Sequence, residues 1–183
     1  QQYYILTGAM GVGKSTVLSE LKNKGLTCVA EPARDILAEQ RTIDGAGVPE
    51  KDAQLFCELL LSRSIASYKH YGNEKGPIIF DRGIPDNISY AQLFELDTDV
   101  YVNAAKHFRY QPMVFFLPGW EAIYQNDDER KMSFAQADAF GKELKAVYAS
   151  LCYKIIEVPF ISALERANFI YNRIKQQEML SSI

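Results

Sequence analysis

A glycine-rich segment near the N-terminus carries the pattern G-x-x-x-x-G-K-[ST], which is typical of phosphate-binding loops (P-loops). Apolar residues 3–6 precede it and residues 17–24 after it have helical spacing, so the loop stands between a strand and a helix. Loop N–H groups can surround a phosphate, and the helix N-terminus adds a partial positive charge. The alternative, an ordinary glycine-rich turn, is disfavoured by this order. The residues expected to bind a nucleotide are Gly8, Ala9, Met10, Gly11, Val12, Gly13, Lys14, Ser15 and Thr16.

Two side chains of this loop add chemistry of their own. Lys14 can reach the outer phosphates of a nucleotide, and the Ser15 hydroxyl can ligate Mg²⁺. We therefore expect ATP and Mg²⁺ as the ligands. A GTPase is a weaker interpretation, because residues 44–47 fit a D-x-x-G spacing without following an apolar strand, and residues 23–26 lack the aspartate that reads guanine.

An acidic and a basic residue come directly after another apolar run, residues 78–80. The Asp81 carboxylate can hold Mg²⁺ or orient the group that receives phosphate, the alternative being a cap for the next helix. Arg82 offers a fork of donors suited to phosphate oxygens, the alternative being a surface ion pair. We expect both to be catalytic, with Asp81 and Ser15 as the metal ligands.

The run of residues 27–30 also ends in a charged cluster. Glu31 at this position could take a proton from an acceptor hydroxyl, or it could be a carboxylate favoured by the dipole of the following helix. Pro32 then fixes the turn. Arg34, one turn further, fits a structural salt bridge slightly better than a substrate contact.

Two further loops could approach a bound nucleotide. The charged residues 126–131 could close over the phosphates as a lid, in which Arg130 would stabilise the charge of the moving phosphoryl group, or they could be a solvated loop. Residues 158–160 follow the last apolar run and could cradle a base or make a simple turn. Trp120 fits packing better than a substrate pocket.

Strand-like and helical runs alternate along the whole chain. Strands are expected at residues 3–7, 27–30, 77–80, 113–117 and 153–158, and helices at residues 13–24, 33–41, 51–71, 85–93, 99–109, 134–151 and 162–177. This order predicts an α/β, three-layer P-loop NTPase fold with a five-stranded parallel sheet. We expect a single domain over residues 1–183, with a small lid at about residues 119–133. Ligands of such sheets bind at the carboxyl ends of the strands, where the charged residues above stand.

These residues together resemble the P-loop kinases of the nucleoside and nucleotide kinase group, and more narrowly the AAA-like proteins related to the kinase domain of the regulator NadR. The resemblance rests on residues 8–16, 31–35, 80–86, the charged stretch ending at Arg130, 158–159 and 165–166. In nucleoside kinases the glutamate after the second strand is the general base, which implies that role for Glu31. Their acidic residue and arginine after the third strand match Asp81 and Arg82. An AAA+ motor is not implied, because the chain is too short for its helical subdomain.

Composition and charge limit the classes of binding partner that we expect. The chain has 183 residues, 48% of them hydrophobic, and a net charge of −3, without a basic run or an apolar run of membrane-spanning length. We expect no nucleic acid and no membrane as partners, a cytoplasmic setting, and compatibility with a homodimer. Cys28, Cys57 and Cys152 lack metal-ligand spacing and are expected to be small core residues in a reducing compartment.

The sequence thus predicts an ATP- and Mg²⁺-dependent phosphotransferase, a P-loop kinase that acts on a small-molecule acceptor such as a nucleoside or nucleotide. The alternative is a regulatory P-loop ATPase with slow hydrolysis and a protein partner. The charged residues at the second and third strand ends favour the kinase, but the identity of the acceptor is not encoded in any motif.

Overall fold

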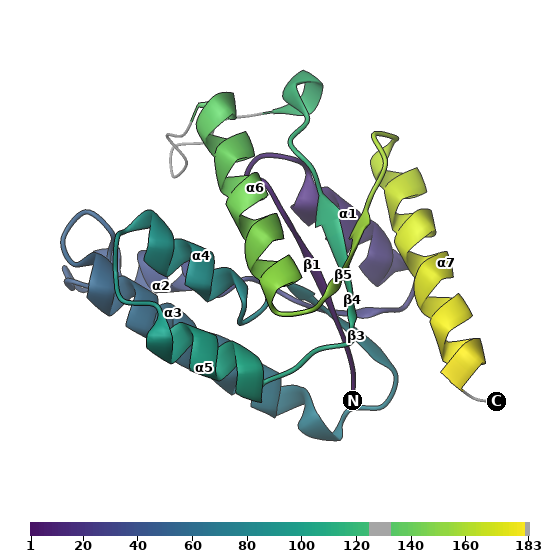
Figure 1. The fold of residues 1–183 in the computed structure, drawn as a ribbon, viewed down its shortest axis with the longest axis horizontal. Coiled ribbons are helices and arrows are strands. Elements are labelled where there is room, and N and C mark those ends of the chain that lie inside the picture. The colour runs from purple at the N-terminus through teal and green to yellow at the C-terminus, as the bar shows by residue number, and fades with distance from the viewer. Residues whose placement is uncertain (125–132, 182–183) are drawn as a thin grey trace.

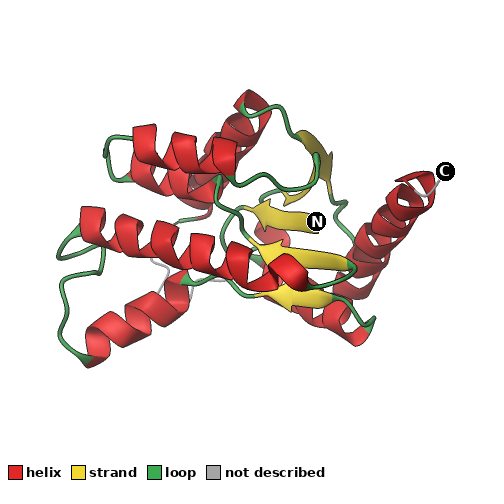
Figure 2. Ribbon diagram, turned by 90° about the horizontal axis from the view of Figure 1, so that it is seen from below, coloured by secondary structure: helices red, strands yellow, loops and turns green. Residues whose placement is uncertain are grey.

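The computed structural model describes residues 1–124 and 133–181, and it places a five-stranded sheet between two helical layers (Figures 1 and 2). The strand order is β2-β3-β1-β4-β5, and each neighbouring pair is parallel. The strands are β1 (Gln2–Gly8), β2 (Thr27–Val29), β3 (Pro77–Asp81), β4 (Met113–Leu117) and β5 (Lys154–Glu157). The predicted α/β fold with a five-stranded parallel sheet is confirmed.

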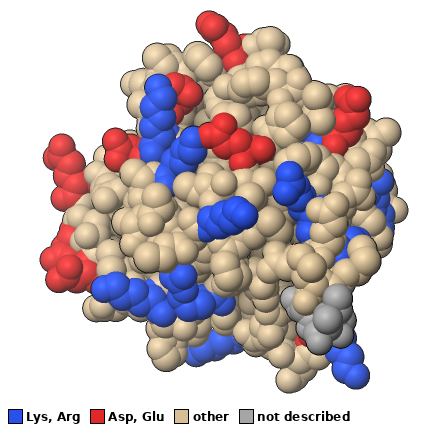
Figure 3. All heavy atoms as spheres, turned by 45° about the vertical axis from the view of Figure 1, so that its right-hand side comes forward, with Lys and Arg blue, Asp and Glu red and all other residues tan. Residues whose placement is uncertain are grey.

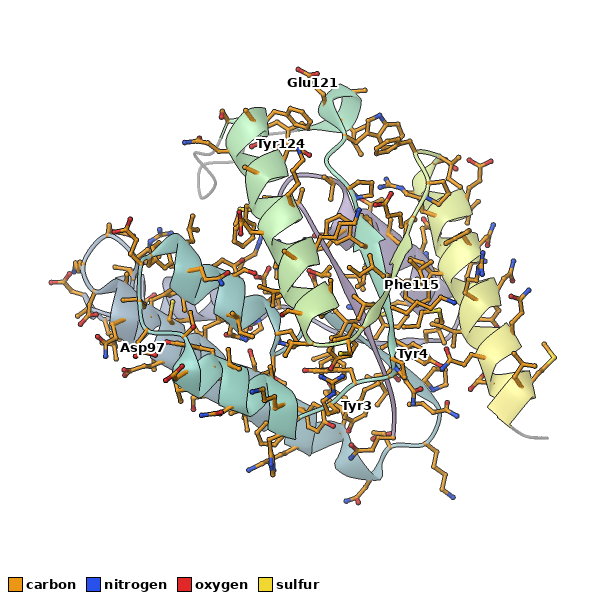
Figure 4. All side chains as sticks on the ribbon, in the orientation of Figure 1. Tyr3, Tyr4, Asp97, Phe115, Glu121 and Tyr124 are labelled. Carbon is orange, nitrogen blue, oxygen red and sulfur yellow. The ribbon has the colours of Figure 1, made fainter. Side chains whose placement is uncertain are left out.

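The central strands are apolar on both faces because helices cover both. Successive side chains of a strand point to opposite faces, so Tyr3 and Tyr4 lie on opposite sides of the sheet (Figure 4). Tyr3 packs in the layer formed by α2 to α6, and Tyr4 packs in the layer formed by α1 and α7. Phe115 of β4 belongs to the same core as Tyr4.

The helices follow the predicted order with small shifts at their ends. They are α1 (Lys14–Asn23), α2 (Ala33–Thr42), α3 (Ala53–His70), α4 (Asp86–Leu93), α5 (Asp99–His107), α6 (Phe134–Ser150) and α7 (Ala163–Ser181), with short 3₁₀ turns at Tyr71–Asn73 and Glu121–Ile123. Side chains cap the starts of α3 and α6: the Asp52 carboxylate accepts from the N–H of Leu55 at 2.9 Å, and Ser133 and Gln136 form a capping box. α7 ends four residues beyond the expected residue 177.

Strand register decides which loops meet. Leu6 of β1 is paired with Asp81 of β3, and Gly8 of β1 is paired with Leu117 of β4. The loop after β1 therefore begins beside the carboxyl ends of two neighbouring strands, and β2 ends next to β3. This is the edge where the sequence places its charged residues.

Candidate active site

The glycine-rich segment forms the turn between β1 and α1, as predicted. Gly8, Gly11 and Gly13 have φ values of 145°, 71° and 79°, a region that disfavours residues with a Cβ. At Gly8 an added Cβ would lie 2.1 Å from the carbonyl oxygen of Leu117, so β4 also excludes a side chain there. The first turn of α1 contains no acidic residue, which leaves its N-terminus open to an anion. This geometry is that of a phosphate-binding loop.

An arginine from the far end of the chain supports the loop from outside. Arg166 of α7 donates to the carbonyl oxygen of Val12 at 2.9 Å and is only 6% exposed. Its guanidinium carbon lies 5.4 Å from the centre of the Trp120 ring, which in turn contacts Phe160. In the sequence, Arg166 is singled out only because residues 165–166 are part of the family resemblance. No local sequence signal predicts its hydrogen bond to Val12.

Lys14 and Asp81 meet at the mouth of the loop. The Lys14 ammonium lies 3.9 Å from Asp81 Oδ1, and the two side chains are 5% and 13% exposed. Burial raises the pKa of Asp81, while Lys14 opposes that shift. Asp81 Oδ1 has no hydrogen-bond partner among the described residues. Asp81 also lines a cavity of about 250 Å³ together with Ser15 and Glu31, so the structure brings the predicted metal ligands to one space.

Arg82 lies at the centre of a buried charge network. Its backbone is left-handed, with φ at 63°, and its guanidinium pairs with Glu31 and Asp86, each at 3.1 Å. It also donates to the carbonyl oxygen of Gly8 at 3.2 Å, which ties it to the phosphate loop. Burial alone would lower the pKa of Arg82, but Tyr90, Glu31 and Asp86 outweigh it and hold that pKa well above its usual value. Arg82 is therefore a fixed, permanently charged part of the site.

Asp86 joins the strands and helices around this arginine, and sequence reasoning assigns it no role. Its carboxylate accepts from the Thr7 hydroxyl at 2.5 Å and from the N–H of Gly83 at 2.8 Å. The hydroxyl of Tyr148 on α6 also donates to it. Asp86 is 1% exposed, so this set of partners replaces water completely. Its place four residues after Arg82, on the next helix, is the one signal that could have found it.

Glu31 faces Arg82 from the loop after β2, and a tyrosine shares the carboxylate oxygen, Oε1, that pairs with Arg82. The Tyr90 hydroxyl donates to Glu31 Oε1 at 2.9 Å, and burial raises the pKa of that hydroxyl far above its usual value. The space between these groups is small, about 10 Å³, and Asn87 lines it as well. The Asn87 Oδ1 atom is buried without a hydrogen-bond partner among the described residues.

Of the remaining predicted site residues, the structure describes Arg34 but not Arg130. Arg34 lines the 250 Å³ cavity beside Glu31 and Lys22. Arg130 and most of the charged stretch lie outside the described residues. Tyr124 of the predicted lid contacts Phe134, the first residue of α6, with their ring centres 5.5 Å apart. In residues 1–124 and 133–181, no group of three or more His, Cys, Asp or Glu could hold a metal by itself.

The sequence of residues 3–166 matches the family model described as AAA domain. The chain belongs to this family. No curated protein matches the sequence of this AAA-domain protein significantly.

Solved structures agree on the fold. A deoxyadenosine kinase from M. mycoides is 17% identical with a TM-score of 0.70, over 95% of this chain and 99% of that one. A NadR protein in complex with NR is 14% identical with a TM-score of 0.70, over 96% of this chain and 52% of NadR, so this chain spans about half of that protein. Thymidylate kinase from Candida albicans is 17% identical with a TM-score of 0.66, over 97% and 92%. The resemblance to P-loop nucleoside and nucleotide kinases is thus confirmed at the level of the fold.

The surface adds two observations. Within the described residues, no helix of this AAA-domain protein is both long and apolar enough to cross a membrane. Acidic and basic side chains are interspersed on the face shown in Figure 3. The homodimer, the cytoplasmic setting and the absence of nucleic-acid partners stay predictions.

Proposed function

We propose that this protein is a kinase that transfers the γ-phosphoryl group of ATP, with Mg²⁺, to a hydroxyl or phosphate of a small molecule of the nucleoside or nucleotide kind. One observation carries the proposal: the phosphate loop, Asp81 and the Glu31–Arg82 pair converge at one edge of the sheet. An acceptor bound over Glu31 would lie in front of the phosphate held by Lys14. Holding the reactants in line and stabilising charge is most of what phosphoryl transfer requires of a protein.

The donor side supports this assignment through its backbone. Loop N–H groups and Lys14 would bind the outer phosphates, and no acidic side chain in the first turn of α1 opposes them. The residues present also fit Mg²⁺, because Asp81 Oδ1 is a buried carboxylate oxygen without a hydrogen-bond partner and shares its cavity with Ser15. When bound there, the ion would neutralise phosphate charge.

The acceptor side supports the assignment through Glu31. An acceptor hydroxyl could take the position of the Tyr90 hydroxyl and give its proton to Glu31 Oε1 as the phosphoryl group arrives. Arg82 pairs with Glu31 Oε1 at 3.1 Å and so holds the carboxylate in place. Asn87 Oδ1 offers an acceptor for an N–H or O–H of the same molecule. We assign residues 119–133 as the lid and Arg130 as its phosphate contact, within a single domain.

A regulatory ATPase with slow hydrolysis is the second candidate, and one observation favours it. The space between Glu31, Arg82 and Tyr90 measures only about 10 Å³, far below the volume of a metabolite. An acceptor that enters this space requires Tyr90 to move, and otherwise it must lie in the cavity of about 250 Å³ that Glu31 also lines, whereas hydrolysis requires space only for water.

A metabolite screen separates the two functions. The full chain is incubated with ATP, Mg²⁺ and single nucleosides, nucleotides or other hydroxyl metabolites, and ADP formation is measured. A kinase shows consumption that rises sharply with one metabolite, while a regulatory ATPase shows a slow rate that no metabolite changes. Lys14→Ala should lower transfer about 100-fold or more, whereas Lys142→Ala, at a 76% exposed position, should not change it. Full activity of Lys14→Ala would disprove the role of the loop.

A further inference from the structure

A second cavity lies between α4 and α6, outside the site described above, and measures about 380 Å³. The two helices pack against each other (Figure 1). Its walls come from positions spaced three and four residues apart, which share one face of each helix. They are Ser89, Gln92 and Leu93 of α4, with Ala139, Phe140 and Glu143 of α6. Gln136, which is already used in the capping box, completes the rim.

One polar atom in this wall is left unsatisfied. Ser89 is 2% exposed, and its hydroxyl has no hydrogen-bond partner within the described part of the chain. A buried hydroxyl without a partner costs about 1–3 kcal/mol, so proteins seldom keep one without a use. A serine in a helix normally bonds a backbone carbonyl of the preceding turn, as Ser64 does with Leu60. Ser89 lines the cavity, so rotation about its Cα–Cβ bond would bring this buried hydroxyl to a molecule bound there.

The lining also sets the charge of that molecule. Leu93, Ala139 and Phe140 provide apolar contact, while Gln92 and Ser89 provide hydrogen-bonding groups. Glu143 is the charged residue of the lining, which contains no lysine or arginine among the described residues. Anions such as nucleotides are consequently disfavoured. The volume falls within the range of small-molecule sites.

From this combination we propose that the α4–α6 cavity binds a neutral nucleoside-sized heterocycle, separately from the acceptor space beside Glu31. The two spaces use different faces of α4, because Asn87 and Tyr90 line the acceptor space and Ser89 lines the α4–α6 cavity. Phe140 connects them: its ring centre lies 5.3 Å from that of Tyr90 and 5.9 Å from the guanidinium of Arg82. A ligand that contacts Phe140 would therefore lie one aromatic ring away from Tyr90.

The binding test uses adenosine as the probe and AMP as the charged comparator, with the full chain in calorimetric titrations. Adenosine should bind, and AMP should bind at least tenfold more weakly because of Glu143. Ala139→Trp fills the cavity from an exposed position, so the variant should fold and lose adenosine binding. Photolabelling with 8-azidoadenosine should mark α4 and α6 peptides in the wild type and not in Ala139→Trp. Unchanged adenosine binding by Ala139→Trp, or labelling confined to the Glu31 and Pro32 peptide, would overturn the proposal.

A second variant separates a ligand-binding role of Ser89 from a structural one. Ser89→Ala removes a hydroxyl without a partner, so it should raise the melting temperature while weakening the binding of adenosine about fivefold. Ser150→Ala removes a hydroxyl that bonds the carbonyl of Val147, and it should lower the melting temperature without affecting adenosine. If wild type and variants bind no adenosine and Ala139→Trp changes only the sedimentation of the chain, the face is a self-association surface and the proposal is wrong. None of these readouts depends on kinase activity, so a failed metabolite screen leaves them valid.

Discussion

The two sides of the candidate active site are built from different materials. The donor side is mostly backbone, in which glycines at φ values of 145°, 71° and 79° allow the loop to turn back on itself. The acceptor side is mostly side chains, in which Arg82, Glu31, Asp86 and Tyr90 pair with one another in a buried network. The donor side is already shaped for an anion, whereas the acceptor side is filled by its own groups.

This difference shows that the stability of each side depends on a different kind of interaction. A loop of glycines depends on conformations that a Cβ excludes, and each position contributes through its local backbone. A network of buried charges depends on completeness, because removal of one member leaves the others desolvated and unpaired. The acceptor side should therefore be the more fragile of the two to single substitutions.

The strongest test removes the centre of the acceptor network. Asp86→Ala leaves Arg82, Thr7 and Tyr148 without their common partner, and we expect a loss of about 3–5 kcal/mol in the free energy of unfolding in urea. Asp138→Ala, which breaks an exposed pair with Lys142, should change it by about 0.5 kcal/mol or less. A loss below about 1 kcal/mol for Asp86→Ala would mean that the network is not cooperative.

The donor side is tested at Gly8. Gly8→Ala places a Cβ 2.1 Å from the carbonyl oxygen of Leu117, so β1 and β4 must separate. We expect the free energy of unfolding to fall by about 3 kcal/mol and nucleotide binding to be lost. Gly25→Ala is the matched control, because Gly25 has a φ of 84° and nothing within 4 Å of an added Cβ. It should lose only about 1 kcal/mol from backbone strain and bind nucleotide normally. Equal losses of stability in both variants would show that backbone strain, and not the contact with β4, is what excludes a side chain at Gly8.

A third test compares the sides through Asp81, which stands between them. Burial raises its pKa in the folded protein above the unfolded value of 3.8, so its ionisation opposes folding as pH rises through that range. At pH 8 Asp81→Asn should therefore be more stable than wild type by about 1 kcal/mol and should melt at a higher temperature. The difference should be smaller near pH 4. Thermal melts at both pH values measure this effect. A variant less stable at pH 8 would show that the contact with Lys14 outweighs burial.

The smallest effect concerns the hydroxyl that fills the acceptor space. Tyr90→Phe removes the 2.9 Å bond to Glu31 but keeps the ring against Phe140, so stability should fall by about 1 kcal/mol or less. For the proposed kinase, KM for the acceptor should fall about threefold while kcat stays within about twofold, because the acceptor no longer displaces a hydroxyl. A large fall in kcat would instead mean that Tyr90 takes part in the reaction.

Much of the fold and the donor side could be predicted from the sequence, because the signals are local. Strand and helix periods gave the order of elements, and the spacing of glycines before Lys14 and Ser15 gave the loop. The charged residues after β2 and β3 were expected at the same edge, and they are there. The choice between a catalytic and a structural role for Arg82 could not be made, because its partners come from β1, the loop after β2, and α4.

Sequence by itself determined that a phosphate loop opens a parallel α/β sheet, since glycine conformation and apolar periodicity act over a few neighbouring residues. Only the tertiary structure decided that Asp86 and Tyr148 hold Arg82, that Tyr90 covers Glu31 and that Arg166 supports Val12. The physical reason is that a buried charge is stabilised by whatever group the fold brings within about 3 Å, and sequence spacing does not encode such distances.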